Sequence, residues 1–177
     1  MVEIDGSMAQ YSSDRTNMAK FILVMVFMIE QRWMYFIEKE LEPDGITMKQ
    51  WLMLIVIGAG FKHAPSIQEV ADAMSTSHQN VKQIAASMER RGFMTLERDE
   101  KNKRIIRLKV TDRCKALFQK RDEHDRKAIL SMFENLTDEE IKVLFGIIAK
   151  MEHRADELYQ SSKKAARPGR TKDTSGD

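Results

Sequence analysis

Helix start signals occur at short intervals in the middle of this chain, and their spacing limits the possible folds more than any other feature. A Ser or Thr followed three residues later by Glu or Gln can satisfy two free amide groups of a first helical turn reciprocally. Such pairs are Thr47 with Gln50, Ser66 with Glu69, and Thr137 with Glu140. Each precedes apolar residues at helical spacing, which predicts helices over residues 47–59, 66–74 and 138–162.

Another short helix is expected almost directly after residue 74. Ser77 is a suitable N-cap and Gly92 suits the left-handed position after a helix, which predicts a helix over residues 77–91. Beyond Gly92 the pattern changes to alternation, which predicts strands over residues 93–98 and 104–110 joined by the polar loop DEKNK. Short helices followed directly by a two-stranded ribbon predict a winged helix-turn-helix.

Long helical segments flank these short elements, so the expected fold class is mainly α with a small β-hairpin wing (α+β). One runs over residues 18–41 and ends at the Pro43-Asp44-Gly45 turn, and another covers residues 112–132. Residues 21–29 are apolar on every side, as expected of a helix that is covered all round. Because so small a domain can hardly cover both faces, we predict that one face packs on its own domain and the other on a second subunit.

Composition excludes several classes of protein. The 177 residues are 42% hydrophobic and 32% charged, which indicates one domain with a sizeable core and loose ends. The densest apolar run, residues 21–29, is far shorter than the roughly 20 residues of a membrane-spanning helix, and no signal peptide pattern is present. The lone cysteine, Cys114, excludes an intrachain disulfide and fits a reducing environment. We therefore expect a cytoplasmic protein without a membrane partner.

No catalytic signature is present. The sequence has no Gly-rich phosphate loop, nucleophile elbow or paired-carboxylate pattern, so we expect neither an enzyme nor a bound cofactor. His63, His78, His124 and His153 lack close ligand spacing, so a metal site would require distant helices to converge.

Charge is distributed unevenly along the chain. Residues 77–109 hold nine Lys or Arg against four Asp or Glu, and residues 163–177 hold five against two, although the whole chain has a net charge of only +2. An acidic body therefore carries a basic module and a basic tail, which indicates an anionic partner at the module. Chance clustering on a solvated face is the alternative.

The helix predicted over residues 77–91 separates apolar from polar residues. Its buried stripe is expected to be Val81, Ile84, Ala85 and Met88. The opposite face carries Gln79, Gln83, Ala86 and Arg90, flanked by Asn80 and Lys82, with His78 in the first turn. No carboxylate occurs before Glu89.

This polar face suits the major groove of double-stranded DNA. Gln and Asn pair with adenine, Lys and Arg suit guanine, and a recognition helix reads base edges with its N-terminal half. The cationic ribbon, with Lys101, Lys103, Arg104, Arg107 and Lys109, can reach phosphates and a minor groove. The predicted DNA-binding residues are Ser77, His78, Gln79, Asn80, Lys82, Gln83, Arg90, Lys101, Asn102, Lys103 and Arg104.

The run EVADAMSTSHQNVKQIAASMERRGFMTLERDEKNKRIIRLKVTDRCKAL resembles the winged helix of the multiple-antibiotic-resistance (MarR) regulators. The residues that match the family's motifs are Val70, Ala71, Met74, Ser77, Glu89, Arg91, Gly92, Arg104, Val110 and Thr111. The resemblance covers about residues 20–160, and ITMKQWLML resembles the family's second helix. One departure is Asn102, which stands where the family usually has an aspartate, so an uncharged amide must orient Arg104 or the wing. Lys109 and Val110 also replace commoner residue types.

The resemblance implies a dimeric, sequence-specific transcription regulator that binds a pseudo-palindromic operator and acts as a repressor released by a small-molecule effector. Residues 18–46 and 111–162 would then be dimerisation helices around a winged lobe over residues 47–110. The ends would be a flexible segment over residues 1–17, in which Gly6-Ser7-Met8 is consistent with the remnant of an expression tag, and a disordered basic tail over residues 163–177.

The resemblance places an effector site among the first, second and fifth helices, where Arg32, Trp33 and Trp51 could hold a small aromatic or phenolic molecule. The alternative is that both tryptophans are core residues and Arg32 lies on the surface. Cys114 is either a redox-sensitive thiol near a helix start or a silent buried cysteine. For the whole protein, the alternatives are a winged-helix protein-interaction module with an acidic partner, and a thiol- or metal-responsive repressor.

Overall fold

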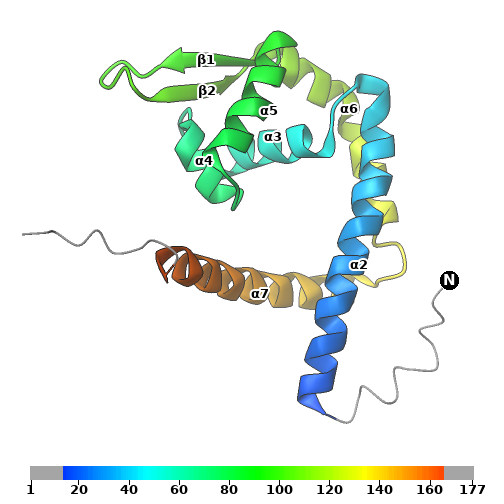
Figure 1. Ribbon diagram of the computed structural model, residues 1–177. Helices are drawn as coiled ribbons and strands as arrows, with labels where there is room; N and C mark the ends of the chain where they lie inside the picture. Colours follow the sequence, from blue (N-terminus) through cyan, green and yellow to red (C-terminus); the bar gives the residue numbers. More distant parts are fainter. Residues whose placement is uncertain (1–13, 166–177) are drawn as a thin grey trace, which may run out of the picture. The chain divides into compact units, whose positions relative to one another are not determined.

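The computed structural model describes residues 14–165, and these residues are mainly helical with a two-stranded antiparallel hairpin (Figure 1). The expected fold class is therefore confirmed. The chain divides into two compact units between Met132 and Phe133, where the sequence predicted one domain with loose ends. The second unit holds helix α7 (Asp138–Ala165) and is described by itself. The predictions for residues 1–13 and 166–177 concern segments outside the described residues.

The short elements of the first unit follow the predicted order. They are α3 (Met48–Gly60), α4 (Ile67–Ala73), α5 (His78–Arg90), β1 (Met94–Arg98) and β2 (Ile106–Val110). At α3 and α4 the Ser/Thr and Glu/Gln partners exchange hydrogen bonds as capping boxes, and the side chain of Ser77 caps α5. Gly92 has a φ of 71°, a left-handed conformation that favours glycine. The helix ends are thus set by local sequence signals.

Two of the three long helices extend beyond their predicted ends. Helix α2 (Arg15–Leu41) starts before residue 18 because the Asp14 carboxylate accepts the backbone amide of Asn17 at 3.2 Å. Helix α6 (Asp112–Ser131) follows the second strand, with Thr111 as its N-cap. Helix α7 continues to Ala165, so residues 163–165 are helical, where the sequence predicted a disordered tail.

The core of the first unit lies between α3, α4, α5 and the hairpin. Its fully covered side chains include Met53, Val70, Val81, Met88 and Leu108, each 0% exposed. Leu108 faces Leu96 across the strands, and its backbone amide donates to the carbonyl of Pro65 at 2.8 Å. The hairpin is therefore attached to the segment before α4 as well as to the core.

Two arginines bind the turn at residues 43–45, which connects α2 to α3. Gly45 has a φ of 63°, which turns the chain sharply after the short 3-10 helix η1 (Glu42–Asp44). Arg91, at the end of α5, donates to the carbonyls of Asp44, at 2.7 Å, and Gly45. Arg121 of α6 donates to the Asp44 carboxylate and to the carbonyl of Glu40, the latter at 2.9 Å. The turn is therefore tied to both α5 and α6.

Helix α2 leaves an apolar surface uncovered. Among the exposed side chains are Leu23, Val24 and Phe27, which are 58%, 53% and 62% exposed. The residues of α2 that pack on the core of the first unit lie near its C-terminal end, at Ile37 and Leu41. Within residues 14–165, no helix is both long and apolar enough to cross a membrane. The apolar segment 21–29 therefore has a surface that the first unit does not bury.

We predict that Arg121→Ala lowers the free energy of unfolding by about 2–3 kcal/mol. Arg121 is only 7% exposed, so its loss leaves a cavity and two neighbouring carboxylates, Asp44 and Asp125, without their cation. Urea denaturation at fixed protein concentration measures the change. The matched control is Arg126→Ala on the same helix, whose exposed pair with Glu123 should contribute little to stability. Equal losses in the two variants would contradict this role for Arg121.

Candidate nucleic-acid interface

Helix α5 buries the stripe that the sequence predicted. Val81, Ala85 and Met88 are 0% exposed and Ile84 is 9% exposed. The turn before α5 contains Ser75, whose φ of 49° is left-handed although the residue is not glycine. The Ser77 hydroxyl oxygen then accepts the backbone amide of Asn80 at 3.1 Å. The first turn of α5 is consequently well defined, with its remaining amide groups directed away from the helix.

The opposite face of α5 presents amides and cations to solvent. The exposed side chains are those of His78, Gln79, Lys82, Gln83 and Arg90. Asn80 is half-buried, because its Nδ2 donates to the hydroxyl of Thr76 at 2.9 Å. That bond holds the amide in one orientation, with the carbonyl oxygen of the side chain available as an acceptor. The structure therefore brings together all the α5 residues predicted to contact DNA. Asn80 differs from the exposed ones because its side chain is half-buried and bonds to Thr76.

Buried polar contacts hold α5 against α3. Gln50 is 7% exposed, and its Nε2 donates to the hydroxyl of Ser87 at 3.2 Å. Its Oε1 accepts the backbone amide of Thr47 and a guanidinium N–H of Arg91 at 3.3 Å. A buried amide with all these partners satisfied fixes the position of the helix that carries it. Sequence reasoning identified Gln50 only as part of a capping box and missed this second role.

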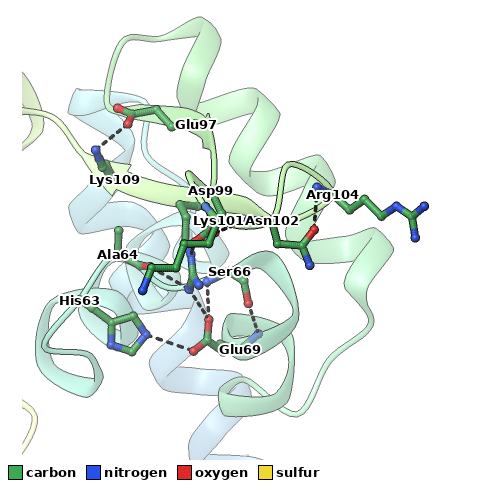
Figure 2. A network of polar contacts seen from close by, with 11 residues as sticks. His63, Ala64, Ser66, Glu69, Glu97, Asp99, Lys101, Asn102, Arg104 and Lys109 are labelled. Atoms are coloured by element: carbon green, nitrogen blue, oxygen red, sulfur yellow. Dashed lines mark hydrogen bonds and ion pairs between the residues drawn. The ribbon is translucent and has the colours of Figure 1, made fainter.

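The tip of the hairpin is ordered by two side chains. The Asp99 carboxylate accepts the backbone amides of Lys101 and Asn102 at 3.0 and 2.8 Å. Asn102 Oδ1 accepts the backbone amide of Arg104 at 3.1 Å. The amide at position 102 thus orients the wing through the main chain, and the Arg104 side chain extends away from the polar network (Figure 2). Lys101, Lys103 and Arg104 are all exposed at this tip.

The two cations of the outer strand are bound by carboxylates. Arg107 donates through Nε to Asp99 at 2.8 Å and through Nη1 to Glu69 at 3.0 Å, while Lys109 pairs with Glu97 at 2.5 Å. Their positive charges are therefore neutralised locally, unlike those of the tip. From the sequence, all five cations of the ribbon were expected to be available to DNA. For Arg107 this expectation was wrong in part because its partner Glu69 lies far away in the chain. The spacing of residues along a strand carries no signal for such a contact.

Glu69 has several partners at the start of α4. It accepts the backbone amide of Ser66 at 2.7 Å, a guanidinium N–H of Arg107, and lies 3.1 Å from His63 Nε2 (Figure 2). The hydrogen bonds from Ser66, together with His63 and Arg107, lower the pKa of the Glu69 carboxyl to about 2. The residue is therefore a carboxylate at all ordinary pH values.

A groove of about 710 Å³ lies between α3 and α6 in the first unit. Trp51, Ile55 and Phe118 contribute apolar surface, and the charged lining residues are of both signs, Lys115 and Arg126 with Asp122 and Asp125. Of the predicted effector residues, Trp51 belongs to this lining, whereas Arg32 and Trp33 of α2 do not. Phe118 and the cations of α6 were missed, because the sequence gives no indication of which side of α6 faces α3.

Cys114 lies at the start of α6 and is 1% exposed. Burial raises the pKa of its thiol, which disfavours the reactive thiolate. Over the described residues 14–165, no cluster of His, Cys, Asp or Glu is suited to hold a metal ion.

Comparison with known proteins identifies the same lobe and the same fold. Residues 44–105 match the model of the MarR family. The transcriptional regulator SlyA superposes with a TM-score of 0.71 at 18% identity, covering 80% of this chain and 98% of its own. A MarR variant from E. coli complexed with operator DNA gives 0.67 at 19% identity, covering 78% and 99%. A third structure, which concerns regulation of DNA binding of Bordetella bronchiseptica BpsR by 6-hydroxynicotinic acid, gives 0.63 at 17%, covering 72% and 90%. At these identities the structural similarity establishes the fold.

We predict that Glu69→Gln lowers the stability of the folded chain near neutral pH, and that its difference from the parent shrinks on acidification. The folded-state pKa of about 2 lies below the ordinary value of 4.5, so the charged form stabilises the fold above pH 4.5. That contribution is lost as the pH falls through the folded-state value. Urea denaturation of both proteins between pH 7 and about pH 2.5 measures the difference. A difference that stays constant with pH would show that the charge of Glu69 contributes nothing.

Proposed function

We propose, from the premise that the chain belongs to the MarR family of winged-helix transcription regulators, that it is a dimeric, sequence-specific DNA-binding repressor. The observation that carries the proposal is the division of charges in the winged lobe. Cations of the outer strand are paired with carboxylates, whereas Lys82, Lys101, Lys103 and Arg104 are exposed on α5 and on the tip of the hairpin. Exposed cations beside exposed amides fit a ligand with both phosphates and base edges.

In this proposal α5 enters the major groove with its N-terminal half. Gln79 and Gln83 can each hydrogen-bond an adenine in a bidentate manner, and Lys82 suits guanine. Asn80 is expected to use its carbonyl oxygen, since Thr76 holds its amide nitrogen. Ser77 and the free amide groups of the first turn suit a phosphate. The well-packed opposite face of α5 fixes these groups relative to one another.

The wing is expected to contact the backbone beside the site that α5 reads. Lys101, Lys103 and Arg104 lie at the exposed tip of the hairpin, and the Arg104 side chain extends away from the polar network (Figure 2). A cation in that position can enter a minor groove or neutralise a phosphate. The structure of the related E. coli protein with operator DNA supports this kind of ligand.

Dimerisation is supported by the apolar side chains that the single chain exposes. On α2 they include Phe27, and on α7, considered by itself, Val143 and Phe145 are 63% and 77% exposed. Apolar surface of this extent usually marks an interface. We propose that α2, α6 and α7 form it. Two copies of α5 about one DNA turn apart would then read a pseudo-palindrome with half-sites roughly 10 base pairs apart.

The groove between α3 and α6 is the site we propose for an effector. Its aromatic side chains, Trp51 and Phe118, fit a small aromatic molecule. An acidic group on that molecule could pair with Lys115 and Arg126, which would have to exchange their present partners, Asp112 and Glu123. The related BpsR, whose DNA binding is regulated by 6-hydroxynicotinic acid, supports an aromatic carboxylic acid as the class of ligand. Release of DNA requires that the effector bind more tightly to a form of the dimer with unsuitable helix spacing.

Substitutions at Gln83 and Arg104 separate base reading from backbone binding. We predict that Gln83→Ala weakens binding by about 1–3 kcal/mol on a duplex recovered by selection from random DNA, and relaxes preference at one base pair per half-site. Arg104→Ala should instead weaken binding to all sequences and reduce the salt slope by about 1 for each phosphate that the arginine neutralises. Fluorescence anisotropy titrations at several salt concentrations measure both. Arg98→Ala, an exposed cation of β1 to which we assign no DNA contact, is the control.

If Gln83→Ala reduced the salt slope and Arg104→Ala relaxed the base preference, the roles assigned to these two residues would be reversed. If both variants bind as the parent does, neither α5 nor the wing makes the proposed contact.

A regulator with an effector site in the groove and one with a redox-sensitive thiol should release DNA in response to different compounds. We expect aromatic carboxylic acids to release the selected duplex from the parent and from Cys114→Ser, and to have at least about tenfold weaker effect on Trp51→Ala. We expect hydrogen peroxide to release DNA from neither the parent nor Cys114→Ser, because the thiol is buried and its pKa is raised. Peroxide release that is lost in Cys114→Ser would favour the thiol-responsive alternative.

A further inference from the structure

The tip of the hairpin is connected to the N-terminus of α4 by a continuous series of polar contacts. Asp99 accepts the amides of Lys101 and Asn102 with one carboxylate oxygen, Oδ1. Its other oxygen, Oδ2, accepts the Nε of Arg107 at 2.8 Å. Arg107 Nη1 then donates to Glu69 at 3.0 Å and to the carbonyl of Ala64 at 3.3 Å. We call Glu69, Asp99 and Arg107 the wing-base cluster (Figure 2).

Each member of this cluster has the geometry and burial of a defined contact. The Arg107 side chain is 26% exposed and that of Asp99 19% exposed, so neither is a freely solvated surface charge. Glu69 is itself held by the capping box of α4. Arg107 also forms a backbone bridge with Ser66, so main chain and side chain attach β2 at the same point. The cluster therefore connects the hairpin to the start of α4.

A two-stranded hairpin on its own is marginally stable in water and does not hold its tip in one direction. The wing is attached to the core by Leu108, four residues away from Arg104 along the chain and inside the paired strands. Beyond the paired residues Arg98 and Ile106, backbone hydrogen bonds from Asp99 to Ile105 at 3.0 Å and from Ile105 to Asn102 at 2.9 Å shape the tip itself. Side-chain contacts of Asp99 and Arg107 connect the tip to the rest of the lobe, whereas the Asn102 side chain bonds within the tip.

We propose that Arg107 and Asp99 are positioning residues that fix the wing tip relative to α5. The tip cations can then contact the DNA without the tip having to become ordered on binding. The inference rests on the proposed function and assigns to these two residues no contact with DNA. Asn102 carries no charge, and Asp99 with Arg107 supplies the ionic attachment of the wing.

The substitution Arg107→Lys tests the proposal without changing net charge. A lysine ammonium cannot reproduce the planar fork that reaches Asp99 and Glu69 together. If the tip must be ordered on binding, affinity for the selected duplex should fall about three- to tenfold, with a salt slope equal to that of the parent. A direct phosphate contact by Arg107 would instead leave Arg107→Lys similar to the parent, and Arg107→Gln would lose about 1 in salt slope. That result would overturn the proposal.

The substitution Asp99→Asn gives an independent test through the sign of its effect. Removing a negative charge near DNA should strengthen binding if Asp99 is an ordinary surface carboxylate. A positioning role predicts the reverse, a loss of about three- to tenfold in affinity for the selected duplex. The matched control is Glu100→Gln, which removes the neighbouring exposed carboxylate and should bind as tightly as the parent or more tightly. Tighter binding by Asp99→Asn would overturn the proposal.

Hydroxyl-radical footprinting separates loss of positioning from general destabilisation of the lobe. The variants Arg107→Lys and Asp99→Asn should lose protection at the edges of the site, where the wing is expected, and keep the central protection due to α5. Equal loss over the whole site would indicate a purely structural role and overturn the inference. If the parent itself selects no DNA sequence, the proposed function fails with it. If the parent binds and both variants match it, only the inference fails.

Discussion

The orientation of the winged lobe depends on the turn at residues 43–45 and on the two arginines that bind it. Arg91 reaches the turn from the end of α5, and Arg121 reaches it from α6. The turn also ends α2, so a single segment is in contact with the helix that presents the polar face and with two helices proposed to form the dimer. Arg121 is almost fully buried and binds Asp44 and Asp125. A movement of α6 relative to the turn that binds α5 would therefore break ionic contacts as well as apolar packing. In the proposed function, an effector-dependent change of helix spacing would therefore act on this turn.

Charged residues in the lobe serve two different purposes, and their partners distinguish them. Arg91, Arg107, Arg121 and Lys109 are bound by carbonyls or carboxylates of the same chain. Lys82, Lys101, Lys103 and Arg104 are exposed on the surface that we propose meets DNA. The first group holds elements of the lobe together, and we propose that the second provides the attraction for DNA. A count of basic residues in the sequence overestimates that attraction, since it includes cations already neutralised within the fold.

Much of the fold was predictable because its signals are local. Capping boxes at Thr47 and Ser66, the N-cap Ser77 and the left-handed Gly92 define helix ends through residues close in sequence. The buried stripe of α5 followed from helical spacing alone. Contacts between distant segments were not predictable, as in the pairing of Arg107 with Glu69, the hydrogen bonds of Gln50 to Ser87, and the lining of the α3–α6 groove by Phe118. Spacing along one element reports which residues share a face, and it carries no information on which element that face meets.

Selection of bound duplexes from a random DNA library at near-physiological salt, followed by sequencing, tests whether α5 reads bases. A dimer with two recognition helices on one face of the duplex should recover a pseudo-palindrome whose half-sites lie about 10 base pairs apart. Recovery of unselected sequence would contradict the claim that α5 reads bases. The basic surface would then be assigned to an acidic protein partner, as in the interaction-module alternative.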